Sequence, residues 1–396
     1  MAFVSESIQR LNMVYNFSID EIEYFFDGES LQLYSGTYPN DPEEKNYLVN
    51  KDESILSKVT FYVTDKCNGS CVYCYEDKGT SLMDIVSADK AIKYLSSNFS
   101  AIDEVSIFGG EAFLNFPLIK RLVEELTQKM AISTFSVVSN GTLITEEHIE
   151  FMSQYNFQVT ISLDGPDYIH DALRKGCPHK LVIKTIEKLK QSPLSELLRI
   201  NCTYTKYHEE KIGRQNLVSY FESLHVPYAI SPVITDIEGL KFPEATQETF
   251  QKAIDQTYEN LASDSNNISI NAYVSATINA LVNHEYRNAF CPVLDSGRAF
   301  DVHGIQHSCT GLVGHVVDES SISKFNSKDN DVCNKCWARG YCFRCPVEEI
   351  KGKEEPPFLA EKCQIQEALE YALKKLVSYL QNDPNTFQLI IDNYFK

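Results

Sequence analysis

The stretch Val59-Thr-Phe-Tyr-Val-Thr64-Asp-Lys-Cys67-Asn-Gly-Ser-Cys71-Val-Tyr-Cys74 places three cysteines directly after an apolar, β-branched run. Such a run predicts a buried strand, so the cysteines belong to the loop that follows it. Three thiolates can hold three irons of a 4Fe–4S cluster and leave the fourth iron open to a small molecule. A structural zinc site would instead require four closed ligands, usually with paired spacings. The stretch therefore predicts a reactive iron–sulfur loop at the end of a strand.

The composition narrows the class of protein. The 396 residues are 43% hydrophobic, which supports a substantial core, and the net charge of −19 disfavours non-specific binding to nucleic acid. The sequence begins Met1-Ala-Phe-Val-Ser-Glu without the basic and apolar regions of a signal peptide, and it contains no long apolar stretch typical of a membrane span. We therefore expect a cytoplasmic protein, whose twelve cysteines favour metal binding or catalysis over disulfides.

Apolar runs alternate with segments of helical periodicity through the middle of the chain. The predicted strands are Val59–Thr64, Val105–Phe108, Phe135–Val138, Val159–Leu163, Leu198–Thr205 and Tyr228–Val233. The predicted helices include Ser87–Asn98, Phe116–Met130, Thr145–Gln154, Leu181–Gln191 and Gly213–Leu224, with Ser87 and Thr145 at N-cap positions. Six strand–helix repeats predict an α/β fold with a parallel sheet, open or curled into a barrel, whose loops carry the site.

Two motifs near the cysteines are specific. Tyr73 stands just before the last cysteine of the loop, and Gly109-Gly110-Glu111 follows the second predicted strand. With the three cysteines, they resemble the motifs of the radical S-adenosylmethionine (SAM) enzymes. The resemblance implies that the open iron chelates SAM, that the reduced cluster cleaves it to a 5′-deoxyadenosyl radical, and that Gly109, Gly110 and Glu111 hold its amino group. The family's usual proline is replaced by Ala112.

Two later segments extend the resemblance over roughly residues 58–235, in the family's order. Ser139-Asn140-Gly141-Thr142, after the third predicted strand, resembles the family's turn near the ribose of SAM, although an ordinary helix-capping turn would also explain it. Ser162-Leu163-Asp164-Gly165-Pro166 follows the fourth strand, and Arg174 lies twelve residues beyond Ser162. The resemblance implies that Tyr73, Ser139, Asn140, Ser162, Asp164 and Arg174 contact SAM, and that Ser162 and Arg174 bind its carboxylate.

Seven further cysteines near the end of the chain resemble the SPASM extension, which is the auxiliary-cluster domain of radical SAM enzymes acting on peptides and proteins. By position, the resemblance assigns one auxiliary 4Fe–4S cluster to Cys333, Cys336, Cys342 and Cys363. It assigns the other to Cys291, Cys309 and Cys345, which leave one iron without a thiolate. The last pair of the quartet is spaced C-x2-C where the family has C-x3-C. A zinc knuckle and a single-cluster tail remain alternatives.

These observations predict five parts. An arm or peptide-docking segment (1–57) precedes a TIM-like partial (β/α)6 barrel (58–235). A helical bridge (236–285), a SPASM domain with two auxiliary clusters (286–365) and a helical tail (366–396) follow, with helix expected over Ala360–Gln381.

The resemblance also implies a reaction. Auxiliary clusters can accept the electron that a substrate radical must lose in an oxidation, so we predict an oxidoreductase that matures a ribosomally made precursor peptide by a thioether or carbon–carbon cross-link. Flavodoxin or ferredoxin would supply electrons, and no nucleic-acid or membrane partner is expected.

Two other functions remain open. Sulfatase maturases of the same family form formylglycine, but Thr310 stands where they carry an aspartate directly after a tail cysteine. A non-enzymatic electron carrier or zinc-stabilised binding protein could use the same cysteines, but it would not need Gly109-Gly110-Glu111 or Arg174.

Several reactive residues remain without a predicted role. Cys202 is expected to be a buried strand residue, and Cys177 lies on a loop as either a spectator or a reactive thiol. The unassigned histidines include His170 and His208. The candidate general bases Tyr204, Asp236 and Asp318 are not distinguished by the sequence.

Overall fold

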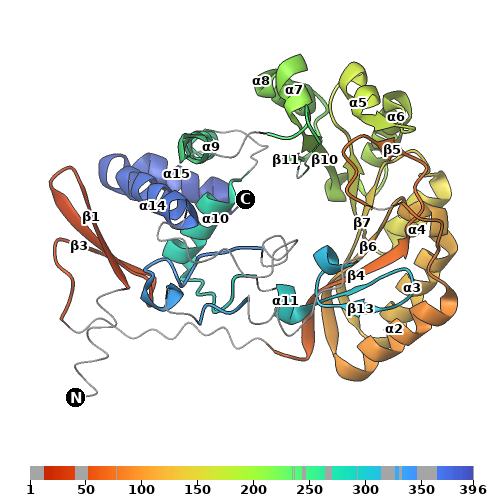
Figure 1. Ribbon diagram of the computed structural model, residues 1–396, viewed down its shortest axis with the longest axis horizontal. Helices are drawn as coiled ribbons and strands as arrows, with labels where there is room; N and C mark the ends of the chain where they lie inside the picture. Colours follow the sequence, from red (N-terminus) through yellow and green to blue (C-terminus); the bar gives the residue numbers. More distant parts are fainter. Residues whose placement is uncertain are drawn as a thin grey trace. The chain divides into compact units, whose positions relative to one another are not determined.

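The structure is a computed structural model, shown in Figure 1, and it describes residues 13–40, 52–76, 78–233, 235, 237–242, 247–263, 270–291, 293–313, 326–329, 332–345 and 364–395. Contacts divide the chain into two compact units. The α/β unit comprises Lys51–Pro243 and Val293–Val316, and the helical unit comprises Met1–Asn50, Glu244–Pro292 and Val317–Lys396. None of the described helices combines the length and apolar character that crossing a membrane requires.

The α/β unit is built on an eight-stranded sheet in the order β11-β10-β8-β7-β6-β4-β12-β13. Its strands are β4 (Ile55–Thr64), β6 (Ala101–Gly109), β7 (Ala131–Ser139), β8 (Gln158–Ser162), β10 (Leu198–Tyr204), β11 (Tyr228–Pro232), β12 (Gly297–Phe300) and β13 (Gln306–His307). All neighbours pair in parallel except β12 and β13. Parallel pairing brings the C-terminal ends of successive strands to one edge of the sheet, where α/β proteins build their sites.

The six predicted strands match β4, β6, β7, β8, β10 and β11, which confirms the α/β fold and its mostly parallel sheet. The pattern did not reveal β12 and the edge strand β13, which are four and two residues long. Strands this short carry too little hydrophobic periodicity to be recognised.

Helices connect the parallel strands, and Figure 1 shows α2, α3 and α4 lined up along one face of the sheet. The connecting helices are α2 (Ile85–Asn98), α3 (Phe116–Lys129), α4 (Glu146–Gln154), α5 (Asp167–Leu173), α6 (His179–Lys190), α7 (Lys206–Lys211) and α8 (Arg214–Ser223). Thr145 is the N-cap of α4, as predicted. The prediction for Ser87 was wrong, because Asp84 caps α2 and its carboxylate accepts a hydrogen bond from the Ser87 amide.

The core of the α/β unit lies between the sheet and these helices. Strand residues such as Val59, Val105 and Val159 are fully buried, and they share one apolar cluster with Leu95 of α2 and Leu122 of α3. Strands buried in this way read as continuous apolar runs. The core therefore explains why the sequence pattern located these strands.

The helical unit combines a small antiparallel sheet with a helix bundle. The sheet joins β1 (Val14–Ile19), β2 (Ile22–Asp27) and β3 (Gln32–Ser35), in a segment where the sequence pattern had indicated no strands. The bundle contains α9 (Gln247–Leu261), α10 (Ala272–Ile278), α14 (Gln364–Asn382) and α15 (Pro384–Tyr394), and α10 runs on into a π-helical turn, Asn279–Asn283. The predicted tail helix thus corresponds to α14.

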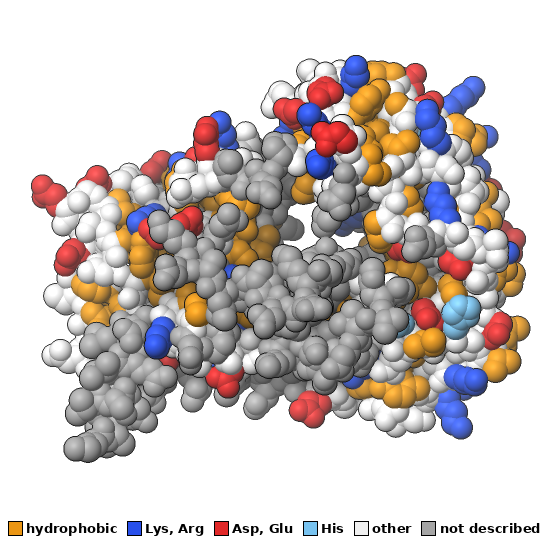
Figure 2. Space-filling model, viewed as in Figure 1, with side chains coloured by type: hydrophobic (Ala, Val, Ile, Leu, Met, Phe, Trp, Pro, Cys, Tyr) orange, Lys and Arg blue, Asp and Glu red, His pale blue; other side chains and the backbone are white. Residues whose placement is uncertain are grey.

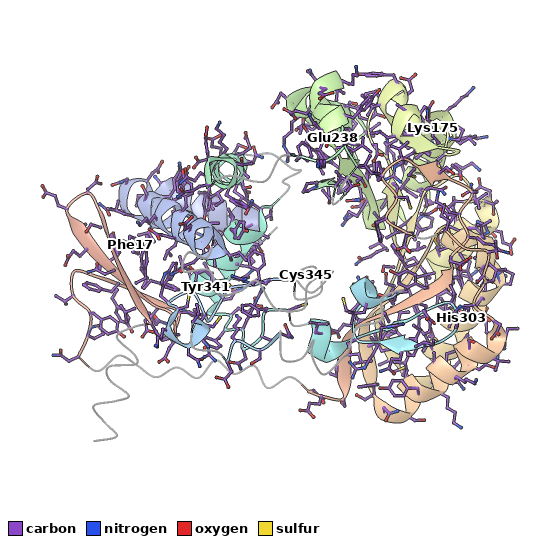
Figure 3. The ribbon with its side chains drawn as sticks, viewed as in Figure 1. Phe17, Lys175, Glu238, His303, Tyr341 and Cys345 are labelled. Atoms are coloured by element: carbon purple, nitrogen blue, oxygen red, sulfur yellow. The ribbon has the colours of Figure 1, made fainter. Side chains whose placement is uncertain are left out.

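Aromatic packing joins the small sheet to the cysteine-rich segment. Phe26 of β2 lies edge-on to Trp337 and Tyr341, with ring centroids 6.0 and 5.5 Å apart. Phe17 and Leu369 belong to the same buried cluster, and Figure 3 labels Phe17 and Tyr341. The N-terminal strands are therefore part of the core that supports the tail cysteines.

The surface carries charges of both signs. Figure 2 shows acidic and basic side chains interspersed over the region of α7 and α8. The ion pair between Lys206 and Glu210 of α7, 3.7 Å apart, is one example. Exposed pairs contribute at most about 1 kcal/mol each, so stability rests on the buried clusters.

Candidate active site

The three-cysteine loop follows β4 and is tied to a distant part of the chain. Its strand β5 (Ser70–Cys71) pairs in antiparallel fashion with β9 (Arg174–Lys175), so that Cys71 lies opposite Arg174. The Val72 amide also donates to the carbonyl of Leu173 over 2.9 Å. Figure 1 labels β5, and Figure 3 marks β9 by Lys175. The structure thus brings together Arg174 and the cysteine loop, as the predicted site requires.

The Gly109-Gly110-Glu111 segment lies against the same loop. The Gly110 amide donates to the carbonyl of Thr64 over 3.0 Å, and the Glu111 amide donates to the carbonyl of Lys66 over 2.8 Å. A Cβ atom on Gly110 would collide with the Lys66 carbonyl and lie 3.0 Å from the Cys67 Cβ. Glycine is required here because two backbones approach each other directly before the first cysteine.

Glu111 is 1% exposed, and its carboxylate organises the ends of β6 and β7. Oε1 accepts hydrogen bonds from Ser139 Oγ (2.8 Å) and the Phe113 amide (3.3 Å), while Oε2 accepts one from the Asn140 amide (2.8 Å). Burial raises the pKa of Glu111, and these donors oppose the rise. The side chain thus shapes the turn at Ser139 and Asn140.

Hydrogen bonds also link the Ser139–Asn140 turn to the cysteine loop. Asn140 Nδ2 donates to Asn68 Oδ1 over 2.8 Å, and Asn68 Nδ2 donates to Thr142 Oγ1 over 2.8 Å. Asn68 stands directly after Cys67 in the chain. The predicted ribose turn and the three-cysteine loop are therefore neighbours, joined by hydrogen bonds that the sequence could not reveal.

A buried ion pair joins the end of β8 to β9. Ser162 is the last residue of β8, and two residues later Asp164 Oδ2 lies 2.9 Å from Arg174 Nε, with the two side chains 0% and 8% exposed. Asp164 also accepts hydrogen bonds from the Tyr73 hydroxyl and the Thr203 amide. Arg174 Nη1 reaches the Cys71 sulfur at 3.9 Å. Arg174 is therefore a buried, oriented cation beside the cysteine loop.

Tyr73 belongs to this network as well as to the loop. Its ring is buried with Ile169 and Leu173, and the Arg174 guanidinium carbon lies 5.5 Å from the ring centroid. Burial, followed by the charge of Asp164, raises the pKa of Tyr73, so the phenol stays protonated and donates to Asp164. Tyr73 thus acts as a positioning residue for the ion pair.

Two histidines without a predicted role form hydrogen bonds with the backbone of Asp164. The Asp164 amide donates to His170 Nδ1 over 3.2 Å, and His208 Nε2 lies 2.8 Å from the Asp164 carbonyl. His208 Nδ1 accepts from the Thr205 amide over 3.0 Å, as in a capping box at α7. Burial lowers the pKa of both rings, so both are neutral. The Thr205-x-x-His208 spacing was the one local signal available for this arrangement.

The donor set of the loop fits an iron–sulfur cluster. Cys67 and Cys71 are half-buried free thiols and Cys74 is an exposed one, all on a single loop. A hydrogen bond from Cys177, followed by the charge of Arg174, outweighs burial and lowers the pKa of Cys71 to about 6, which favours the thiolate needed for iron. No three His, Cys, Asp or Glu side chains in the described residues are grouped around a single metal position. In a 4Fe–4S cluster each thiolate binds a different iron, so three cysteines of one loop can hold such a cluster.

The tail cysteines are partly described. Cys333, Cys336 and Cys342 line one cavity together with Lys328 and Arg339, among other residues. The fourth predicted ligand, Cys363, lies outside the described residues. Cys291 and Cys345 belong to the helical unit, and Cys309 belongs to the α/β unit, so that ligand set remains a prediction.

The remaining candidate residues are Cys202, Tyr204, Asp236 and Asp318. Cys202 is fully buried in β10, as expected. Tyr204 donates to Glu209, and burial followed by that hydrogen bond raises the pKa of Tyr204, so the phenol stays protonated. Asp236 and Asp318 lie outside the described residues.

Comparison with known proteins identifies the central part of the chain. Residues 61–209 match the model of the radical SAM superfamily. The radical SAM cyclopropyl synthase TigE of Paramaledivibacter caminithermalis is 27% identical over 45% of this chain and 43% of that protein. The sporulation killing factor maturation protein SkfB of Bacillus subtilis is 32% identical over 38% of this chain and 37% of that protein. These matches, like that to an uncharacterised Methanocaldococcus jannaschii protein, span less than half of each relative.

Other similarities cover most of the chain. A cysteine-type anaerobic sulfatase-maturating enzyme of Clostridium perfringens is 23% identical over 80% of this chain and 96% of that protein. Among solved structures, anSMEcpe with bound AdoMet superposes with a TM-score of 0.64 at 19% identity, over 82% of this chain and 98% of that one. SuiB of Streptococcus suis, bound to the precursor peptide SuiA, superposes at 0.55 and 15% identity over 79% and 76%. At these identities the two structures establish the shared fold.

Proposed function

We propose that this chain, whose residues 61–209 form a radical SAM domain, is a maturase that oxidatively cross-links a ribosomally made precursor peptide. One observation carries the proposal: the three-cysteine loop, the glycine-rich segment before Glu111 and the buried Arg174 meet at the C-terminal ends of the parallel strands. Neither an electron carrier nor a zinc-stabilised module would need the last two features. We propose further that the parallel strands form the partial (β/α)6 barrel typical of this family.

The chain's own residues would divide the work of binding. Cys67, Cys71 and Cys74 would hold a 4Fe–4S cluster, which when reduced supplies the electron that cleaves SAM to a 5′-deoxyadenosyl radical. Arg174, already oriented by Asp164, would attract the SAM carboxylate.

The remaining motif residues would complete the SAM site. Both oxygens of Glu111 already accept hydrogen bonds, so this carboxylate would act by holding the Ser139–Asn140 turn against the ribose. The adjacent backbone of Gly109 and Gly110 would then face the amino group. Ser162, the last residue of β8, would also contact SAM.

The tail would supply the oxidising part of the reaction. The cavity that Cys333, Cys336 and Cys342 line also receives the cationic side chains of Lys328 and Arg339, which suits a negatively charged cluster. We propose that these cysteines and Cys363 hold one auxiliary cluster, and that Cys291, Cys309 and Cys345 hold another. Such clusters would accept the electron that the peptide radical loses, and flavodoxin or ferredoxin would reduce the SAM cluster.

The test uses anaerobically reconstituted protein with SAM, a reductant and a short precursor peptide encoded beside its gene. We expect 5′-deoxyadenosine above the level formed without peptide, together with a peptide lighter by two hydrogens. Iron analysis should give about twelve irons per chain, as three 4Fe–4S clusters require. The same assay on a Cys67→Ala, Cys71→Ala, Cys74→Ala variant should give neither product while retaining tail iron. Unchanged peptide and background 5′-deoxyadenosine with the intact protein would refute the proposal.

A second candidate is formylglycine formation on a sulfatase. The match to nearly the whole sulfatase-maturating relative favours it, and Thr310 in place of the family's aspartate weighs against it. A sulfatase-type peptide containing a cysteine distinguishes the two. Conversion of that cysteine to an aldehyde, detected by hydrazide labelling, would favour the sulfatase reaction over the cross-link.

A further inference from the structure

Cys177 lies beside the three-cysteine loop although 103 residues separate it from Cys74 in the chain. It is 1% exposed, and its sulfur lies 2.5 Å from the position that a Cβ atom on Gly69 would take. The same Cβ position lies 3.7 Å from the Cys67 sulfur, and the neighbouring Cys177 thiol is the main cause that lowers the pKa of Cys71. A fourth thiol therefore packs directly against the loop that holds the predicted ligands.

Backbone contacts hold this thiol in place. The Cys177 amide donates to the Arg174 carbonyl over 3.0 Å, and Arg174 is paired with Cys71 through β9 and β5. On the other side, His170 accepts from the Asp164 amide at Nδ1, so its Nε2 carries the proton and donates to the Cys177 carbonyl, 2.8 Å away. Hydrogen bonds on both sides thus fix the backbone of Cys177 beside the strand that pairs with Cys71.

The direction of a hydrogen bond between the Cys71 and Cys177 sulfurs would follow from iron binding. A cysteine bound to iron is a thiolate and has no proton to donate, so the proton between Cys71 and Cys177 must belong to Cys177. Cys71 would then accept from the Cys177 thiol and from Arg174 Nη1, which lies 3.9 Å away. Arg174 already forms an ion pair with Asp164. Among the hydrogen bonds described, none joins the Cys177 thiol to a carboxylate.

We propose that Cys177 is a positioning residue whose thiol donates a hydrogen bond to the cluster-bound sulfur of Cys71 and raises the reduction potential of the SAM-binding cluster. The inference rests on the proposed function, because it requires a cluster at Cys67, Cys71 and Cys74. Reduction adds one negative charge to a cluster, and a hydrogen bond to a ligand sulfur stabilises the reduced form more than the oxidised form. Cys177 would therefore make the cluster easier for its external donor to reduce.

The experiment is a redox titration of the full-length, anaerobically reconstituted protein, followed by electron paramagnetic resonance. The signal that changes on adding SAM distinguishes this cluster from those of the tail. Cys177→Ala removes the donor and should shift the midpoint potential to a more negative value. Cys177→Ser retains an O–H donor and should restore most of the shift. Cys202→Ala is the matched control, since Cys202 is also buried in the α/β unit but contacts His208; its potential should equal that of the unmodified protein.

Each outcome is decisive. Equal potentials in Cys177→Ala and the unmodified protein would overturn the inference and leave the proposed function intact. Loss of the SAM-responsive signal in both Cys177 variants, but not in Cys202→Ala, would make Cys177 an iron ligand and would also overturn it. A SAM-responsive signal missing from the unmodified protein would count against the proposed function itself.

Discussion

Asp164 and Arg174 form a buried ion pair, Oδ2 to Nε 2.9 Å, that connects the end of β8 to the strand lying against the cysteine loop. The carboxylate also accepts from Tyr73 and from the Thr203 amide, while the guanidinium reaches Cys71. Ten residues of sequence separate the pair, and these neighbours come from two other segments, the cysteine loop and β10. The orientation of Arg174 is therefore a property of the fold.

Replacing Asp164 by Asn should destabilise the α/β unit. The change leaves the Arg174 cation buried without its counterion, and breaking such a pair costs about 3–5 kcal/mol. Urea unfolding followed by circular dichroism measures the loss. The matched control is Asp89→Asn, because Asp89 pairs with Arg121 at 2.9 Å on the surface and should change stability by at most about 1 kcal/mol. Equal effects of the two substitutions would show that the buried pair has no special role.

Replacing Glu111 by Ala should weaken SAM binding. Three donors, on Ser139, Asn140 and Phe113, lose their acceptor, and a hydrogen bond to a charged group contributes about 1.5–3 kcal/mol. We expect the dissociation constant for SAM to rise at least about tenfold, measured by calorimetry on the reconstituted protein. Glu104→Ala is the control, since Glu104 also accepts from a serine, Ser136, but lies in the middle of the sheet. Unchanged SAM affinity in Glu111→Ala would contradict the assignment.

Stability should decrease as the pH falls below about 6.5. His170 and His208 are neutral in the folded protein because burial lowers their pKa, whereas an unfolded histidine has a pKa of about 6.5. Below that pH the unfolded chain binds protons that the folded chain does not. The stability contributed by these rings is therefore fully present above pH 6.5 and is lost as the pH falls towards their folded pKa values, by at most about 1.4 kcal/mol per ring and pH unit.

His170→Gln tests this dependence, because the amide can accept from Asp164 and donate to the Cys177 carbonyl but does not titrate. Urea unfolding at pH values about one unit to either side of the unfolded pKa should give a shallower dependence of stability on pH for this variant. His303→Gln, an exposed position labelled in Figure 3, should leave the slope unchanged. The explanation fails if the His170 variant keeps the slope of the unmodified protein.

Replacing Lys328 by Met should destabilise the helical unit. The buried ammonium donates to the carbonyls of Arg287, Arg339 and Cys342 at 2.7–2.9 Å, although burial lowers its pKa to about 8. Each buried carbonyl left unpaired costs about 1–3 kcal/mol, so we expect a loss of at least about 2 kcal/mol.

Trp337 is a direct probe of this loss of stability, since it is the chain's single tryptophan and is buried in the helical unit. Its fluorescence during urea unfolding reports on that unit. Lys335→Met, an exposed lysine at the rim of the same cavity, is the control and should have little effect. Equal midpoints for the two variants would show that the ammonium does not hold the cysteine-bearing loop.

Much of the α/β unit could be predicted because its strands are buried on both faces and therefore read as apolar runs. The same reasoning missed β1, β2 and β3, where exposed and buried aromatic residues alternate irregularly. It also placed a helix cap at Ser87 instead of Asp84, because both residues can cap and only the backbone geometry distinguishes them. The motif residues were found because short spacings between cysteines and glycines carry chemical meaning.

The sequence by itself determined the kind of chemistry, since the three cysteines of the loop and the glycines before Glu111 are local patterns whose spacing alone limits what they can bind. Only the tertiary structure decided what surrounds them. Cys177, His170 and Asp164 reach the loop through strand pairing and buried hydrogen bonds between segments about a hundred residues apart. Such contacts depend on the register of the whole sheet, and a one-dimensional pattern carries no record of it.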